Sequence, residues 1–219
     1  IASVEELRGK KIAVRPHGQP HAVTLWLRML GLEKSVETVI VHDKEVGRWG
    51  QWKKVASGEC VAAFMSPLYL PAALNAGLKV LPVPDIPIVG HFAQACLADF
   101  ARPHDNLMRA YVKSVLHALA WLTLNPSLAY AALETELQSA LELSDAAELR
   151  RRFDSVVSGL KLRPYPTPQA IANTYEIATI EYPSARGLNP LSLWDWHWVR
   201  QLDDLGFIDE LATRPQDAF

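Results

Sequence analysis

The first 81 residues alternate short apolar runs with helical segments, and this alternation limits the fold more than any other feature. Four runs rich in β-branched or apolar residues predict strands at 11–15, 37–42, 60–65 and 79–81. The segments between them predict helices that each end at a glycine, at 20–30, 48–57 and 67–76. A strand–helix repeat with short connections predicts a parallel sheet covered by helices on both faces. We therefore expect an α/β fold.

The character of the chain changes near residue 86. Prolines 82, 84 and 87 predict a stiff, extended crossing segment, and residues 91–97 predict one more strand. After Pro103 apolar residues recur at helical spacing, which predicts one helix that ends at Asn125. Further helices are predicted at about 126–138, 144–157, 166–181 and 190–205. The predicted organisation is an α/β lobe over 1–86 and a largely helical part over 87–219.

Composition excludes several classes of protein. The 219 residues are 49% apolar, and the formal net charge of −2 argues against a nucleic-acid-binding protein, which usually has a basic face. Charged residues interrupt every apolar stretch before the roughly 20 residues that a membrane span needs. Cys60 and Cys96 are too few for a disulfide framework. Both lie in apolar runs, and we interpret them as buried thiols, with a bridge as the alternative.

The predicted sheet also indicates where a ligand binds. In parallel sheets, ligands bind beyond the carboxyl ends of the strands. This rule selects the loops that start at Arg15, His42 and Met65. Ser66 either caps the following helix or faces the ligand. Trp49 and Trp52 either form an aromatic wall there or pack in the core.

The loop 15–21 has the features of an anion site. It leads into a predicted helix, and free N–H groups at a helix start favour anions. Gly18 permits close approach of the backbone, and Arg15 offers paired donors to a carboxylate or sulfonate, with Gln19 beside them. The alternative is a plain strand–helix turn in which Arg15 pairs with a nearby acid.

Four histidines, His17, His21, His42 and His91, map to this sheet edge or to the crossing segment. Imidazole transfers protons near neutral pH and binds metals. Pro20 interrupts the helical spacing between His17 and His21, so no metal site is predicted. Surface or capping histidines are the alternative interpretation. Nucleophile-elbow, Walker, dinucleotide-binding and zinc-protease motifs are absent from the sequence.

Several segments carry a family resemblance in their order and spacing. They are residues 4–14, Gly31-Leu32, 56–67, 76–81, Asp99-Phe100, Pro103, Trp121 to Pro126, and 201–208. The chain resembles the type II periplasmic-binding-protein-like superfamily, in the branch of sulfonate-, nitrate-, taurine- and thiamine-precursor-binding proteins. Members have two α/β lobes. The resemblance implies that 1–86 is the second lobe and that 87–219 supplies the crossover strand and C-terminal helices of the first, whose N-terminal strands lie outside this sequence.

The resemblance implies a solute-binding receptor of an ABC-type uptake system, which holds a small carboxylate or sulfonate between its lobes. Its partners are then the transporter's membrane subunits, its location is periplasmic or extracytoplasmic, and it needs no cofactor. The predicted ligand contacts are Arg15, His17, Gly18, Gln19, His21, His42, Met65, Ser66 and His91.

An enzyme is the alternative. Val14-Arg15 and residues 24–28 are similar to the corresponding strand and helix of 4,5-dihydroxyphthalate decarboxylase-like proteins, which share this fold and are cytoplasmic. In that case His17, His42 and His91 are the expected catalytic residues, because histidine suits proton transfer to a carbanion. A divalent metal is compatible with that activity.

Overall fold

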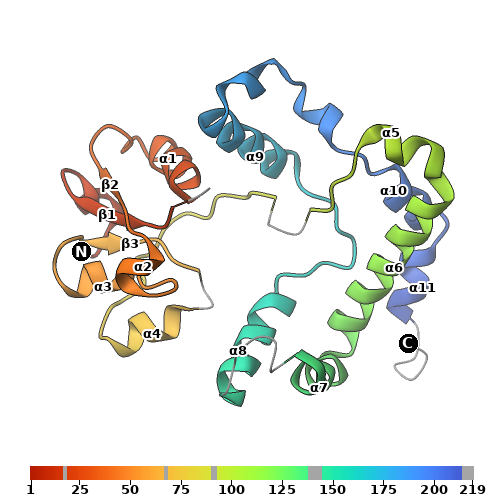
Figure 1. The fold of residues 1–219 in the computed structure, drawn as a ribbon, viewed down its shortest axis with the longest axis horizontal. Coiled ribbons are helices and arrows are strands. Elements are labelled where there is room, and N and C mark those ends of the chain that lie inside the picture. Colours follow the sequence, from red (N-terminus) through yellow and green to blue (C-terminus); the bar gives the residue numbers. More distant parts are fainter. Residues whose placement is uncertain (17–18, 67–68, 90–92, 138–144, 214–219) are drawn as a thin grey trace. The chain divides into compact units, whose positions relative to one another are not determined.

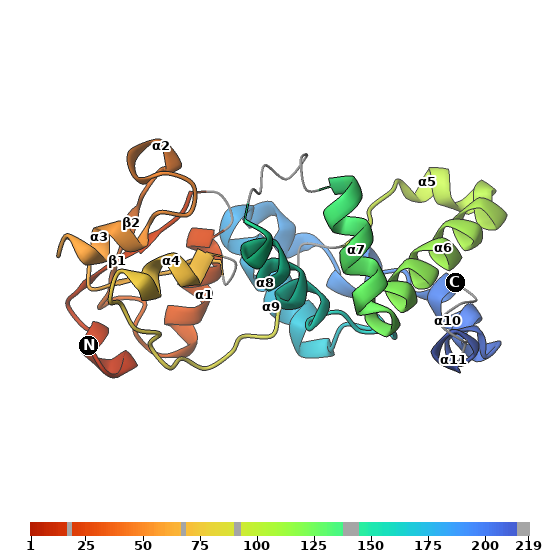
Figure 2. The same cartoon turned by 90° about the horizontal axis from the view of Figure 1, so that it is seen from below.

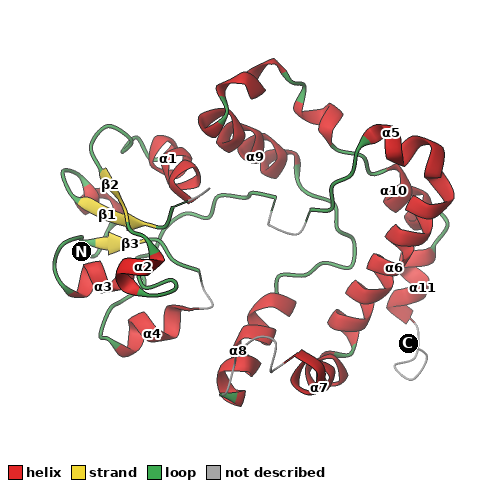
Figure 3. Ribbon diagram, viewed as in Figure 1, coloured by secondary structure: helices red, strands yellow, loops and turns green. Residues whose placement is uncertain are grey.

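The computed structural model has an α/β fold, as predicted, and describes residues 1–16, 19–66, 69–89, 93–137 and 145–213 (Figure 1). Contacts divide the chain into two units. The first comprises Ile1–Gly90 and Thr167–Ser192, and the second comprises His91–Pro166 and Leu193–Phe219. Figure 3 shows that the strands belong to the first unit and that the second is built from helices.

A parallel sheet forms the centre of the first unit. Its strands are β1 (Lys11–Val14), β2 (Glu37–Ile40) and β3 (Ala62–Ala63), in the order β2-β1-β3. Ile12 of β1 lies opposite Thr38 on one side and Ala62 on the other. Three predicted strands are thus confirmed, although β3 is much shorter than the predicted 60–65.

The central strand is buried on both faces, as expected for a parallel sheet between helices. Ile12 and Val14 pack into a cluster with Trp26 of α1 (Gln19–Met29). Ala13 points to the opposite face and packs with Val46 and Cys60. Helices α2 (Asp43–Val46) and α3 (Trp52–Ala56) lie on that second face. The prediction of helices on both faces is therefore confirmed.

The predicted helix 48–57 is wrong in its first half. Helix α2 ends before Gly47, and α3 begins only at Trp52. Between them Gly47 and Trp49 have φ angles of 82° and 56°, which lie in the left-handed region and interrupt a right-handed helix. A turn over 47–51 therefore replaces the predicted helical start.

Two predicted strands are absent from the described residues. Residues 79–81 and the described part of 91–97, residues 93–97, form no strand. Leu81 and Ile86 instead pack their side chains against the α1 cluster. Pro82, Pro84 and Pro87, which follow residues 79–81, lack the N–H that a ladder needs. Helix α4 (Leu70–Asn75) precedes this segment.

Helix α9 (Pro168–Glu181) returns to the first unit and packs against α1. Arg28 Nη1 donates to Glu176 Oε1 at 2.7 Å across this contact. The side chain of Asn173 donates to the Pro87 carbonyl oxygen at 2.8 Å, and the Val89 N–H donates to Thr174 at 2.9 Å. These bonds attach the segment 87–89 to α9. Three short 3-10 helices are also described. They are η1 (Val4–Leu7) and η4 (Pro183–Gly187) in the first unit, and η5 (Pro190–Leu193), which ends at the first residue of the second unit's last segment.

The second unit is helical over its described residues. Its elements are α5 (Ala98–Ala101), η3 (Arg102–His104), α6 (Asp105–Leu124), α7 (Pro126–Leu137), α8 (Ala146–Val157), α10 (His197–Asp204) and α11 (Phe207–Thr213). Helices α10 and α11 lie beside α6 in both views (Figures 1 and 2), and Leu116, Leu202 and Ile208 are buried between them. Among the described helices, none combines the length and the apolar character needed to cross a membrane.

The predicted helix 190–205 is interrupted. Helix α10 begins at His197, and residues 194–196 are not helical. The Asp195 carboxylate accepts the His197 N–H at 3.0 Å, a local bond that favours a helix start at this point. The rings of Trp194 and Trp196 stack 6.4 Å apart before it.

Candidate functional site

An arginine–aspartate pair joins the loops that follow β1 and β2. Arg15 comes directly after β1, and Asp43 is the first residue of α2. Arg15 Nη2 donates to Asp43 Oδ2 at 2.6 Å, and Nε donates to Oδ1 and Oδ2 at 3.1 Å each. Because the strands are parallel, both residues lie at the carboxyl edge of the sheet, where ligands bind in this class of fold.

Asp43 is also held by the turn that follows α2. The Trp49 N–H and the Gln51 side-chain amide each donate to Asp43 Oδ1 at 3.4 Å. The Arg15 guanidinium is the main cause that lowers the pKa of Asp43, and the bonds from Gln51 and Trp49 lower it further. Asp43 is therefore a carboxylate at neutral pH, and its charge balances that of Arg15.

Two aromatic rings lie beside this pair. The Arg15 guanidinium carbon is 4.6 Å from the Trp49 ring centre, a cation–π distance. Trp49 also stacks on Tyr69, with ring centres 5.7 Å apart. Both aromatic residues are half-buried. We call Arg15, Asp43, Trp49, Gln51 and Tyr69 the carboxyl-edge cluster.

The sequence of the turn explains how Trp49 comes to lie there. Trp49 adopts a left-handed conformation, which costs a residue other than glycine about 1–2 kcal/mol. Gly50 is buried, and a Cβ at this position would lie 2.2 Å from the Val46 carbonyl oxygen. Only glycine fits so close to the end of α2. In this turn Gln51 is buried and Trp49 is half-buried.

The predicted ligand contacts lie outside the described residues, in the first turn of α1, or at the carboxyl edge. His17, Gly18 and His91 lie outside the described residues. Gln19 is the first residue of α1. At the carboxyl edge lie Arg15, His42, Met65 and Ser66. His21 lies in the first turn of α1, where its Nδ1 is 3.4 Å from Glu181 of α9.

Among these residues, the structure assigns local roles to two. His42 is exposed at the N-cap of α2, and its N–H donates to Glu45 Oε1 at 3.2 Å. Ser66 accepts the Tyr69 N–H at its carbonyl oxygen, at 3.0 Å. Arg15 shows the pairing with an acid that was the alternative to ligand contact. The ligand contact of Arg15 stays a prediction.

Three members of the carboxyl-edge cluster, Asp43, Gln51 and Tyr69, were not predicted as site residues. Asp43 could have been found, because it lies just beyond a predicted strand at the same sheet edge as Arg15. The place of Gln51 depends on the turn at Gly47 and Gly50, whose sequence is in part typical of a helix. Tyr69 lies one turn beyond Ser66, and no feature of the sequence marked it as a site residue.

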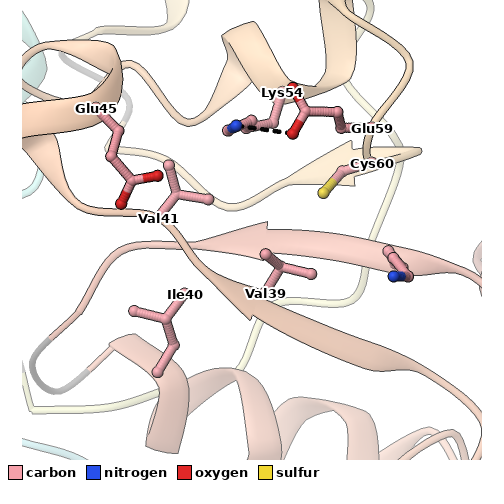
Figure 4. A pocket seen from close by; sticks show the side chains of 8 residues that line it. Val39, Ile40, Val41, Glu45, Lys54, Glu59 and Cys60 are labelled. Atoms are coloured by element: carbon pink, nitrogen blue, oxygen red, sulfur yellow. Dashed lines mark hydrogen bonds and ion pairs between the residues drawn. The ribbon is translucent and has the colours of Figure 1, made fainter.

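A second feature is an open cavity of about 250 Å³ on the α2–α3 face of the sheet (Figure 4). Its lining comprises Lys11, Val39, Ile40, Val41, Glu45, Lys54, Glu59 and Cys60. Both lysines are paired, Lys54 with Glu59 at 2.7 Å and Lys11 with Glu37 at 3.4 Å. The acids therefore compensate the two lysines, as Asp43 compensates Arg15 at the carboxyl edge.

The two cysteines differ, which corrects the prediction that both are buried. Cys60 is buried and Cys96 is exposed, because residues 93–97 do not form the expected strand. Burial raises the pKa of the Cys60 thiol and so reduces its thiolate fraction.

With the thiol reagent DTNB at pH 8, we expect Cys96 to react about tenfold or more faster than Cys60. Cys96→Ser should remove the fast phase and Cys60→Ser the slow one; equal rates would contradict this assignment.

Over the described part of the chain, no group of three or more His, Cys, Asp or Glu side chains is arranged to hold a metal ion. Comparisons of the chain with protein-family models, with curated proteins and with solved structures each found no match. We therefore infer function from the carboxyl-edge cluster.

Proposed function

We propose that the carboxyl edge of the sheet binds a small organic anion, a carboxylate or a sulfonate. One observation supports this most strongly. A guanidinium is fixed at the edge where parallel sheets bind ligands, and 34% of the Arg15 side chain is exposed. Asp43 fixes the guanidinium through its Nε and Nη2 groups. Such a planar donor matches the paired oxygens of a carboxylate or sulfonate.

Two neighbouring features favour the same ligand chemistry. Helix α1 begins at Gln19, shortly after Arg15, and the N–H groups of a helix start attract negative charge. Trp49 and Tyr69 add aromatic surface beside the guanidinium for the organic part of the ligand. Polar groups next to an apolar wall are typical of small-molecule sites.

In this proposal the protein is a solute receptor of an ABC-type uptake system with the two-lobed, type II periplasmic-binding-protein-like architecture. The ligand bridges two lobes and shifts a hinge equilibrium toward a closed form. The transporter's membrane subunits then recognise that form, which requires an extracytoplasmic location. Binding of this kind needs no cofactor.

The decarboxylase alternative requires histidines at the reacting centre. Of His17, His42 and His91, only His42 is among the described residues, and it is exposed at the start of α2. No observation on the described residues therefore favours the enzyme over the receptor.

Arg15→Ala tests the proposed site. We expect the variant to bind the tightest of four probe anions, acetate, methanesulfonate, benzoate and benzenesulfonate, at least tenfold more weakly than the wild type. Tenfold corresponds to about 1.4 kcal/mol of binding free energy. Isothermal titration calorimetry measures the change directly. Loss of a partly exposed ion pair should reduce the free energy of unfolding by no more than about 1 kcal/mol.

Arg8→Ala is the matched control. Arg8 is also an exposed arginine of the first unit that pairs with an acid, Glu5, at 3.0 Å, but it precedes β1 and lies away from the carboxyl edge. Its removal should leave anion affinity unchanged. Equal affinity in Arg15→Ala and wild type, or binding of none of the four anions by the wild type, would refute the proposed site.

A further inference from the structure

We infer that Gln51 is a positioning residue, which fixes the Asp43 carboxylate and through it the guanidinium of Arg15. The inference rests on the proposed function, because the group that is positioned is the proposed anion contact. Gln51 itself is fully buried, with 0% of its surface exposed, so it acts only through its neighbours.

The Gln51 side chain links the end of a strand to the Asp43 carboxylate. Its Nε2 donates to the Val41 carbonyl oxygen at 3.1 Å and to Asp43 Oδ1 at 3.4 Å. Val41 follows β2 directly, and its N–H donates to the Val14 carbonyl oxygen of β1 at 2.8 Å. The amide is thus anchored to the sheet itself. Asp43, which has 30% of its side chain exposed, gains a rigid support on its buried side.

The other end of the same amide shows that packing alone does not account for glutamine here. Gln51 Oε1 is buried and has no hydrogen-bond partner among the described residues. A buried oxygen without a partner lowers stability, and an apolar side chain of similar length would avoid that loss. In return, glutamine provides a donor to both the Val41 carbonyl oxygen and Asp43. We therefore expect its removal to affect the position of Arg15 more than the stability of the fold.

Gln51→Met tests this directly, since methionine keeps the length of the side chain and removes both the donor and the unpaired oxygen. Arg15 Nε–H donates to Asp43, so its NMR signal should exchange slowly with solvent in the wild type. In Gln51→Met we expect this exchange to become at least tenfold faster and the affinity for methanesulfonate to fall at least threefold. The urea midpoint should stay close to that of the wild type, because removal of the unpaired Oε1 offsets the loss of the donor to the Val41 carbonyl oxygen.

Gln51→Glu adds a readout that a purely structural role would not change. The charged and titratable groups connected with this position are Asp43 and Arg15, with Tyr69 close to Arg15. The carboxyl introduced by this substitution can still donate to Asp43 when it is protonated, whereas its ionised form repels Asp43. Burial raises the pKa of a carboxyl, so Arg15 Nε–H protection in this variant should fall between about pH 5 and pH 8. The wild type should show no such step.

Lys53→Met is the matched control, because Lys53 lies two residues from Gln51 in α3 and its Nζ donates to the Val46 carbonyl oxygen at 2.6 Å rather than to Asp43. It should leave Arg15 Nε–H exchange unchanged. Unchanged exchange in Gln51→Met, or fast exchange in the wild type, would overturn the inference. Binding of none of the probe anions by the wild type would refute the proposed function, while the exchange measurement would still decide whether Gln51 positions Arg15.

Discussion

Gly50→Ala should lower the free energy of unfolding of the first unit by about 3 kcal/mol, because the new Cβ has no space. It would lie 2.2 Å from the Val46 carbonyl oxygen and 3.0 Å from that of Gly47. Both contacts are with backbone, so relief requires α2 and the turn after it to separate. Since this turn carries Trp49 and Gln51, anion binding should be lost together with stability.

Urea unfolding followed by tryptophan fluorescence measures this change. Gly187→Ala is the matched control, because nothing lies within 4 Å of the Cβ it adds and its φ is not in the left-handed region. That variant should differ from the wild type by less than about 0.5 kcal/mol. If Gly50→Ala were as stable as Gly187→Ala, the described packing of the turn against α2 would be wrong.

Trp26→Ala should reduce the free energy of unfolding by about 3–5 kcal/mol, the usual effect of truncating a buried aromatic residue. Trp26 is only 4% exposed and lies in the cluster formed by α1 and one face of β1. Its ring meets Phe64 edge to face with ring centres 5.1 Å apart. Its indole N–H also donates to the Pro84 carbonyl oxygen at 3.4 Å, so the change removes one attachment of the segment after α4 to the core.

Trp52→Ala provides the comparison for this variant. Trp52 is half-buried at the start of α3 and lies 5.9 Å from Lys53 Nζ in a cation–π contact. Its truncation should cost about 1 kcal/mol. Equal losses in the two variants would show that the cluster around α1 is not the main core of the first unit.

The sequence was informative where the local pattern and the tertiary structure agree. The β-branched run of β1, the apolar surface of α1 and the stop at Gly31 each predicted the observed element, and Gly31 has the expected left-handed φ of 67°. Arg15 could be placed at the carboxyl edge because its position depends only on the end of β1. Such signals depend on neighbouring residues alone, and here the tertiary structure does not override them.

The remaining features depend on distant partners. Residues 79–81 have a strand-like sequence, yet Leu81 packs by its side chain against the α1 cluster and forms no ladder. The turn at 47–51 depends on a backbone approach at Gly50 that no periodicity encodes. The pairing of Arg15 with Asp43 joins residues 28 positions apart, so its prediction requires the order of the strands in the sheet.

An NMR titration tests the central claim, that an organic anion binds at the carboxyl edge, most directly. Methanesulfonate and benzoate are added to ¹⁵N-labelled protein while the Arg15 Nε–H, the Trp49 indole N–H and the Lys54 and Glu59 amides are followed. We predict saturable shifts of the Arg15 and Trp49 signals, with Lys54 and Glu59 unchanged. Shifts confined to Lys54 and Glu59, or no saturable shift at Arg15 with either anion, would contradict the claim.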